Sequence, residues 1–134
     1  MTPPYAIEKR ITQPYEDRLL HYLANWWNWD DGKTEEVMKQ ILAHPLCDRG
    51  TALLLYWRSQ TPEIEADVSR IPLYQQPDFE LAALIEARLQ ENQFASEVIS
   101  YDPKEDADLP EKFKREVPFE WLQPSAGIRP DFGR

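Results

Sequence analysis

The sequence predicts an all-α fold, a single domain of about five to six helices arranged as helical hairpins. Apolar residues recur at helical spacing over long stretches, and prolines or short polar turns separate these stretches. Strand-like alternation is clear only over residues 97–101, where it is isolated. The 134 residues, 42% of them hydrophobic, suit one domain with one core.

Two helices are predicted on either side of an Asp-Asp-Gly turn. Pro14 suits a first helical turn, and the leucines and tryptophans that follow it predict an amphipathic helix over residues 14–27. Thr34, with two glutamates behind it, is interpreted as the N-cap of the second helix. That helix is expected to end near His44, because Pro45 disfavours α-helical backbone in the residue before it.

Three further helices are expected before residue 102. Asp48 is a plausible N-cap for the third, and the run over residues 52–57 is apolar on every side, which predicts a central, buried helix. Pro62 opens a short acidic helix that reaches about Ser69, and Pro77 opens a longer one with a wide apolar stripe. The stripe consists of Leu81, Ala82, Leu84, Ile85 and Leu89.

The composition changes after residue 102, which predicts a helical domain over residues 1–102 and a proline-rich arm over residues 103–134. The arm carries five prolines and several aromatic residues, too many aromatics for a purely solvated tail. We expect a short helix near residues 110–116, followed by an extended segment that packs on the domain. Two alternatives are an arm that orders only on binding a partner, and helical pairs that form divergent solenoid-like units.

The charge is unevenly distributed and disfavours nucleic acid as a partner. The net charge is -9, and residues 60–108 alone hold twelve acids and three bases. Nucleic acids and anionic membranes need a basic surface, so the natural complement of this segment is a basic protein. The alternative is that the acids only solvate helix faces. Without an 18-residue apolar run or a signal-peptide pattern at the N-terminus, we expect a cytoplasmic protein, and the lone Cys47 agrees with a reducing compartment.

One stretch carries a family resemblance. Trp27-Asn28-Trp29-Asp30-Asp31-Gly32 is followed by Cys47-Asp48 and then by Gly50-Thr51-Ala52-Leu53-Leu54-Leu55-Tyr56-Trp57. In order and spacing this pattern resembles the bacterial family catalogued as domain of unknown function 4274. The resemblance implies a helical domain with a core over about residues 19–101. Small members of such families often occur as immunity proteins that neutralise secreted toxins, and the resemblance implies no catalytic residues.

The tryptophans of this stretch have a structural interpretation. Each indole can bury on the order of 200 Å², so Trp26, Trp27 and Trp29 together could hold two helices across the turn. The alternative is that one indole stays exposed as an anchor for a partner.

Catalytic and metal-binding interpretations have little support in the residues. Asp30, Asp31 and Asp48 would be the acids of a hydrolase, but turn and capping chemistry accounts for them more simply. His44 and Cys47, with His21 elsewhere, are a thin supply for a zinc site or a nucleophile pair. Glycine-rich phosphate loops are also missing from the sequence. We therefore expect no catalytic, metal or cofactor site.

The sequence favours a non-enzymatic bacterial immunity protein that binds a basic toxin domain through an acidic surface. Carboxylates would steer association, and an exposed aromatic residue would add short-range affinity. The candidate partner-binding residues are Glu63, Glu65, Asp67, Tyr74, Asp78, Phe79, Glu80 and Glu86. The alternatives are a helical adaptor that docks a cellular partner through its C-terminal arm, and a hydrolase.

Overall fold

The computed structural model describes residues 18–64, 67–106, 113 and 115–129 of the chain. Among these residues the regular structure is helical, which confirms the all-α prediction. Residues 18–26 belong to a first helix. The remaining α-helices are α2 (Thr34–Ala43), α3 (Arg49–Arg58), α4 (Gln76–Glu91) and the single turn α5 (Pro103–Asp106). Four 3₁₀ turns complete the list: η1 (Thr61–Glu63), η2 (Val68–Arg70), η3 (Leu73–Gln75) and η4 (Phe119–Leu122).

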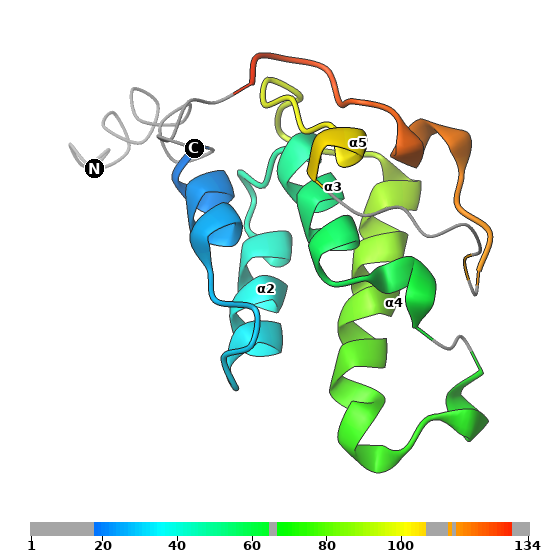
Figure 1. Cartoon of the computed structure of the whole chain (residues 1–134). Helices are drawn as coiled ribbons and strands as arrows, with labels where there is room; N and C mark the ends of the chain where they lie inside the picture. Colours follow the sequence, from blue (N-terminus) through cyan, green and yellow to red (C-terminus); the bar gives the residue numbers. More distant parts are fainter. Residues whose placement is uncertain (1–17, 65–66, 107–112, 114, 130–134) are drawn as a thin grey trace, which may run out of the picture.

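The first helix, α2, α3 and α4 run alternately in opposite directions (Figure 1). The turn before α2, the last residues of α3 and the start of α4 therefore lie at one end of this helical layer, which we call the cleft end. The start of α3 and the last residues of α4 lie at the other, which we call the hub end. Helix α4 packs against both α2 and α3. Every residue from Gly50 to Trp57 is buried, so the prediction of a central helix is confirmed.

The turn between the first helix and α2 differs in its capping from the sequence prediction. Thr34 is the first residue of α2, and the N-cap position belongs to Lys33, which makes no side-chain cap bond. The Thr34 hydroxyl donates to the carbonyl of Asp31 (2.7 Å) and accepts from the Trp27 indole N–H (2.9 Å). The predicted N-cap is wrong because this hydroxyl is already used to close the turn and to fix the indole.

The tryptophans at this turn are buried to different degrees. Trp27 and Trp29 are half-buried and pack against the core, and the Trp29 indole N–H donates to the carbonyl of Ala24. Trp26 is 47% exposed. Two of the three indoles therefore join the turn to the body of the protein.

The connection between α3 and α4 is not the predicted acidic helix. Residues 61–63 and 68–70 form separate 3₁₀ turns, Ile64 has extended backbone, and residues 65–66 lie outside the described part. Helix nucleation is costly and is normally offset by burial of an apolar stripe, which a short acidic segment lacks. The prediction over residues 62–69 is therefore wrong.

Helix α4 begins at Gln76, with Pro77 in its first turn as predicted. Leu81, Ala82, Ile85 and Leu89 are buried. Leu84 is exposed, so its place in the apolar stripe is a wrong prediction. At 100° per residue it lies more than a quarter-turn away from the direction that the four buried residues share.

Residues beyond α5 add to the same core. The buried Trp121 accepts a hydrogen bond on its carbonyl from the Trp57 indole (2.8 Å), and its ring meets Tyr56 edge-on. Ile99 and Ile128 form an isolated parallel bridge. The helix expected near residues 110–116 lies largely outside the described residues, and the boundary at residue 102 stays a prediction.

Candidate functional site

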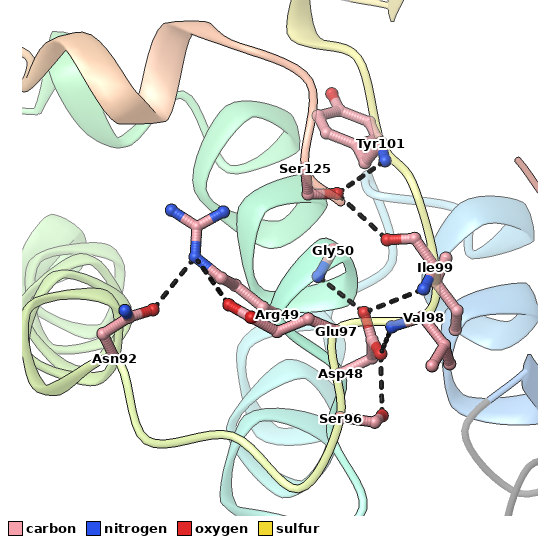
Figure 2. Close-up of polar contacts among 10 residues, drawn as sticks. All are labelled: Asp48, Arg49, Gly50, Asn92, Ser96, Glu97, Val98, Ile99, Tyr101 and Ser125. Atoms are coloured by element: carbon pink, nitrogen blue, oxygen red, sulfur yellow. Dashed lines mark hydrogen bonds and ion pairs between the residues drawn. The ribbon is translucent and has the colours of Figure 1, made fainter. Parts of the chain in front are cut away.

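A buried polar network centred on Asp48 lies at the hub end of the helical layer (Figure 2). Asp48 is completely buried at the N-cap of α3, as predicted, and its Oδ1 accepts from Gly50 N (2.8 Å). Its Oδ2 accepts from the Ser96 hydroxyl (2.7 Å) and from Val98 N (2.8 Å). A longer bond to Oδ1 comes from Ile99 N (3.3 Å). We call these five residues the Asp48 hub.

The hub depends on close approach of two backbones. A Cβ added at Gly50 would lie 2.0 Å from the carbonyl oxygen of Ile99 and 2.9 Å from Ser125 Oγ. The Ser125 hydroxyl donates to that Ile99 carbonyl and accepts from Tyr101 N (Figure 2). Both carboxylate oxygens of Asp48 are thus occupied by protein donors, and the residue holds three segments together. This is structural work, as its N-cap interpretation predicts.

A second feature, at the cleft end, is a cavity of about 640 Å³ that we call the acidic cleft. Its walls come from the turn before α2, the end of α3 with η1, and the segment that leads into α4. The residues that line it are Trp29, Asp30, Asp31, Gly32, Thr34, Glu35, Arg58, Ser59, Gln60, Glu63, Ile64, Ile71, Gln75, Asp78 and Leu81. Its volume falls within the range of about 300–1,000 Å³ that is usual for ligand sites.

The lining of the acidic cleft carries a strong excess of negative charge. Five of its residues are carboxylates, and Arg58 is its single cation. The guanidinium of Arg58 is already engaged, because its Nη2 donates to Asp106 (2.7 Å) and to the side chain of Asn25 (2.8 Å). The remaining carboxylates therefore lack a cation among the lining residues.

Two carboxylates of the cleft have an unsatisfied oxygen. The buried Oε2 of Glu35 and the buried Oε1 of Glu63 have no hydrogen-bond partner. Placement in the first turn of a helix, where the macrodipole favours acids, accounts for Glu35 in α2 and Asp78 in α4. It does not account for Glu63, which lies in η1.

The sequence-predicted partner-binding residues separate into groups. Glu63 and Asp78 line the acidic cleft. Asp67 is exposed, and hydrogen bonds from Ser69 lower its pKa. Glu80 forms an exposed ion pair with Lys39 (3.2 Å).

The other predicted residues differ in accessibility. Tyr74 is 79% exposed, whereas Phe79 is partly buried. Glu86 is half-buried and forms an ion pair with Arg115. Glu65 lies outside the described residues.

Sequence reasoning did not single out Glu35 or Leu73. Leu73 is 82% exposed, more than Tyr74 beside it. The signal that could have found it is an apolar pair that follows Pro72 and belongs to no helical or strand-like pattern. Glu35 carries no local signal, because first-turn glutamates are common.

A third polar cluster surrounds the C-terminal half of α3. His21 is buried and hydrogen-bonds through Nδ1 to Thr51 Oγ1 (2.9 Å). Burial, together with the positive charge of Arg58, lowers the pKa of His21 to about 4. The hydroxyl of Tyr101 donates to Asp106 (2.6 Å), and burial raises the pKa of that tyrosine. His21 is therefore neutral at physiological pH.

The other residues considered for chemistry have ordinary contacts. His44 accepts from Leu46 N through Nδ1 (3.0 Å), and the buried Cys47 contacts the carbonyl of Asp48. Over residues 18–64, 67–106, 113 and 115–129, no three His, Cys, Asp or Glu side chains are grouped so that they could hold a metal ion. In the same part of the chain, no helix has the length and apolarity needed to cross a membrane.

The fold and these features define a small all-α domain with a saturated polar hub at one end and an acidic cleft at the other. The model of the family described as Domain of unknown function (DUF4274) matches residues 16–90. The chain belongs to this family. The match includes every residue that lines the acidic cleft, and it ends before Ser96, Val98 and Ile99 of the hub. No curated protein and no solved structure gives a significant match.

Proposed function

We propose that this protein is a non-enzymatic bacterial immunity protein that neutralises a basic toxin domain by binding it with its cleft end. The observation that carries the proposal is an exposed apolar pair, Leu73 and Tyr74, on the segment that forms one wall of the acidic cleft. Binding alone would neutralise the toxin if it covers the toxin's active site or blocks its substrate.

The apolar pair has the character of an interface anchor. Single exposed apolar residues are normal on protein surfaces, but these two are adjacent and are followed by Gln75 and Asp78 of the cleft wall. Interfaces typically combine a few aromatic or large apolar anchors with a polar rim that excludes water. Leu73 and Tyr74 would supply the anchor, and the carboxylates around them the rim.

The charge at the cleft end favours a basic partner. Exposed Asp67, Asp78 and Glu80 surround the route into the cleft from the same connecting segment and from α4. Complementary charge raises association rates and disfavours acidic partners. Rapid capture suits a protein that must bind a toxin before the toxin reaches its target.

Co-expression with the product of the neighbouring gene tests the proposal. If that product stops growth of a bacterial host, co-expression of this protein restores growth, and the double variant Leu73→Ser/Tyr74→Ser loses protection while keeping its helical content. Phe119→Ser, at an exposed site in η4, is the matched control and keeps protection. A product that is harmless alone, or that stays toxic in the presence of this protein, refutes the proposal.

A helical adaptor is the second candidate, favoured by the exposed Phe119 and Ile128 in the C-terminal segment. The same variants separate the two functions. If partner binding is lost on Phe119→Ser with Ile128→Ser and retained with Leu73→Ser/Tyr74→Ser, the C-terminal segment is the docking site and the adaptor function replaces the first proposal.

A further inference from the structure

We infer that the acidic cleft is a receptor site for an arginine side chain that the partner inserts from its surface. The inference rests on the proposed function and names the chemical group that the cleft recognises. It is drawn from the mixed lining of the cavity, from the two unpartnered carboxylate oxygens, and from the commitments of the neighbouring arginines.

The lining of the cleft matches a side chain that is apolar along its stem and cationic at its end. Ile71 and Leu81 are buried in the wall and Ile64 is partly buried. They offer apolar surface next to the carboxylates. Arginine and lysine bury their methylene stems against such surface while the charged group makes polar contacts. A small inorganic cation would use the carboxylates and leave the apolar wall uncovered.

The unpartnered oxygens of Glu35 and Glu63 indicate what the ligand must supply. A buried acceptor without a donor costs about 1–3 kcal/mol, and more when it is charged. A ligand that donates hydrogen bonds to both oxygens recovers that cost on binding. A guanidinium has five N–H donors in one plane and can serve two carboxylates at once, whereas an ammonium is a compact point charge.

The arginines of this chain that lie nearby are held elsewhere. Arg58 lines the cleft but is bound by Asp106 and Asn25. Arg115 forms an ion pair with Glu86 and donates to the carbonyl of Thr61, one turn of chain before Glu63. The donors that the two glutamates lack must therefore come from another molecule.

Trp29 adds a reason to expect arginine rather than lysine. Its ring lines the cleft while its indole N–H is used by the carbonyl of Ala24. A guanidinium can lie flat on an indole face and keep its in-plane N–H groups free for carboxylates. The cavity volume of about 640 Å³ exceeds what one side chain needs, which leaves room for the adjoining backbone of a partner loop.

The test uses the full chain and three tripeptides with blocked ends: Gly-Arg-Gly, Gly-Lys-Gly and Gly-citrulline-Gly. The readout is the ¹⁵N-indole NMR signal of Trp29, assigned with Trp29→Phe, during titration at low ionic strength. We expect a saturable shift with the arginine peptide, at least tenfold weaker binding of the lysine peptide, and no shift with the citrulline peptide, a neutral isostere. Equal binding of arginine and citrulline peptides overturns the inference, and so does the absence of any shift with arginine.

Matched charge-removing variants locate the binding site. Glu35→Gln combined with Glu63→Gln is expected to weaken binding of the arginine peptide at least tenfold. Glu36→Gln is the control, because Glu36 is the exposed neighbour of Glu35 on the same turn and does not line the cleft. Equal losses in both proteins would show a general effect of net charge and overturn the assignment to the cleft. Thermal melts verify that each variant is folded.

These experiments separate the inference from the proposed function. No partner is needed for the peptide titration, so a negative titration together with protection in the growth assay removes the arginine site and leaves the immunity function. A positive titration together with a harmless neighbouring gene product leaves an arginine-binding domain and removes the immunity function.

Discussion

The two ends of the helical layer treat buried carboxylate oxygens in opposite ways. At the hub end, Asp48 accepts hydrogen bonds from four protein donors. At the cleft end, one buried oxygen of Glu35 and one of Glu63 accept none. Because an unsatisfied buried acceptor costs free energy and a satisfied one does not, the hub end supports the fold and the cleft end draws stability from it.

The contrast separates a family's signature from its candidate site of action. The motif from Cys47 to Trp57 is the most distinctive part of the sequence, yet it forms the buried helix α3 and its cap. The cleft consists of residues that carry no such motif. Unsatisfied groups with room beside them are therefore a better guide to binding in this protein than the most recognisable sequence.

The largest expected effect is at the hub. Gly50→Ala places a methyl group 2.0 Å from the backbone carbonyl of Ile99, which no rotamer change can relieve. We expect a loss of about 3 kcal/mol or more in the free energy of unfolding, at the upper end of overpacking costs. Urea denaturation measures it. Gly32→Ala is the control, since an added Cβ there meets nothing within 4 Å and is expected to change stability by less than about 1 kcal/mol. Equal midpoints for both variants would contradict the close approach.

The next effect depends on pH and concerns His21. Its pKa of about 4 in the folded protein lies below the model value of 6.5, so the unfolded chain takes up the proton first. The associated stability is complete above pH 6.5 and is lost as the pH falls towards 4, by at most about 3 kcal/mol. In urea titrations at several pH values, His21→Asn is expected to flatten this slope. His44→Asn is the matched control; a slope that is unchanged in His21→Asn assigns the loss to other groups.

Removing one charge from each end sharpens the contrast directly. Asp48→Asn replaces an acceptor oxygen by an amide, so at least one hub donor loses its partner, and we expect a loss of about 2 kcal/mol. The measurement is the denaturant midpoint at neutral pH. Asp31→Asn serves as the control, because Asp31 closes an exposed turn that asparagine also tolerates. A hub that tolerates asparagine as well as the turn does would not be the stabilising element described above.

The smallest effect is expected for Glu63→Gln. This substitution removes a charge whose buried oxygen has no donor, so the free energy of unfolding is expected to stay the same or to rise by up to about 1 kcal/mol. Differential scanning calorimetry beside Asp48→Asn compares the two ends in one experiment. A destabilisation as large as that of Asp48→Asn would show that Glu63 supports the fold, which would remove the contrast between the ends.

Local features of the fold are those that the sequence predicts well. The cap at Asp48 involves a donor only two residues away, and an all-apolar run needs burial whatever surrounds it. The wrong predictions depend on tertiary context. The Thr34 hydroxyl closes the preceding turn instead of capping, and the acidic segment over residues 62–69 finds no surface to bury and stays in short turns.

The candidate site is less accessible to sequence reasoning. The charge excess points to Glu63 and Asp78, but no pattern places them in one cavity with Glu35, which is on a different helical pair. An unsatisfied oxygen is a statement about every neighbour of that atom. It follows from the packed structure and not from the spacing of residues.

The hub also has a consequence for the order of events during synthesis. Asp48 leaves the ribosome about fifty residues before Val98 and Ile99, which supply two of its four donors, and Ser125 follows later still. The nascent N-terminal helices thus carry a carboxylate that only water can serve, and contacts of such long range close late and slowly. The hub end of the molecule is expected to become native only after this second segment has emerged. A chain stopped at the end of the family match would keep the acid but lack three of its donors.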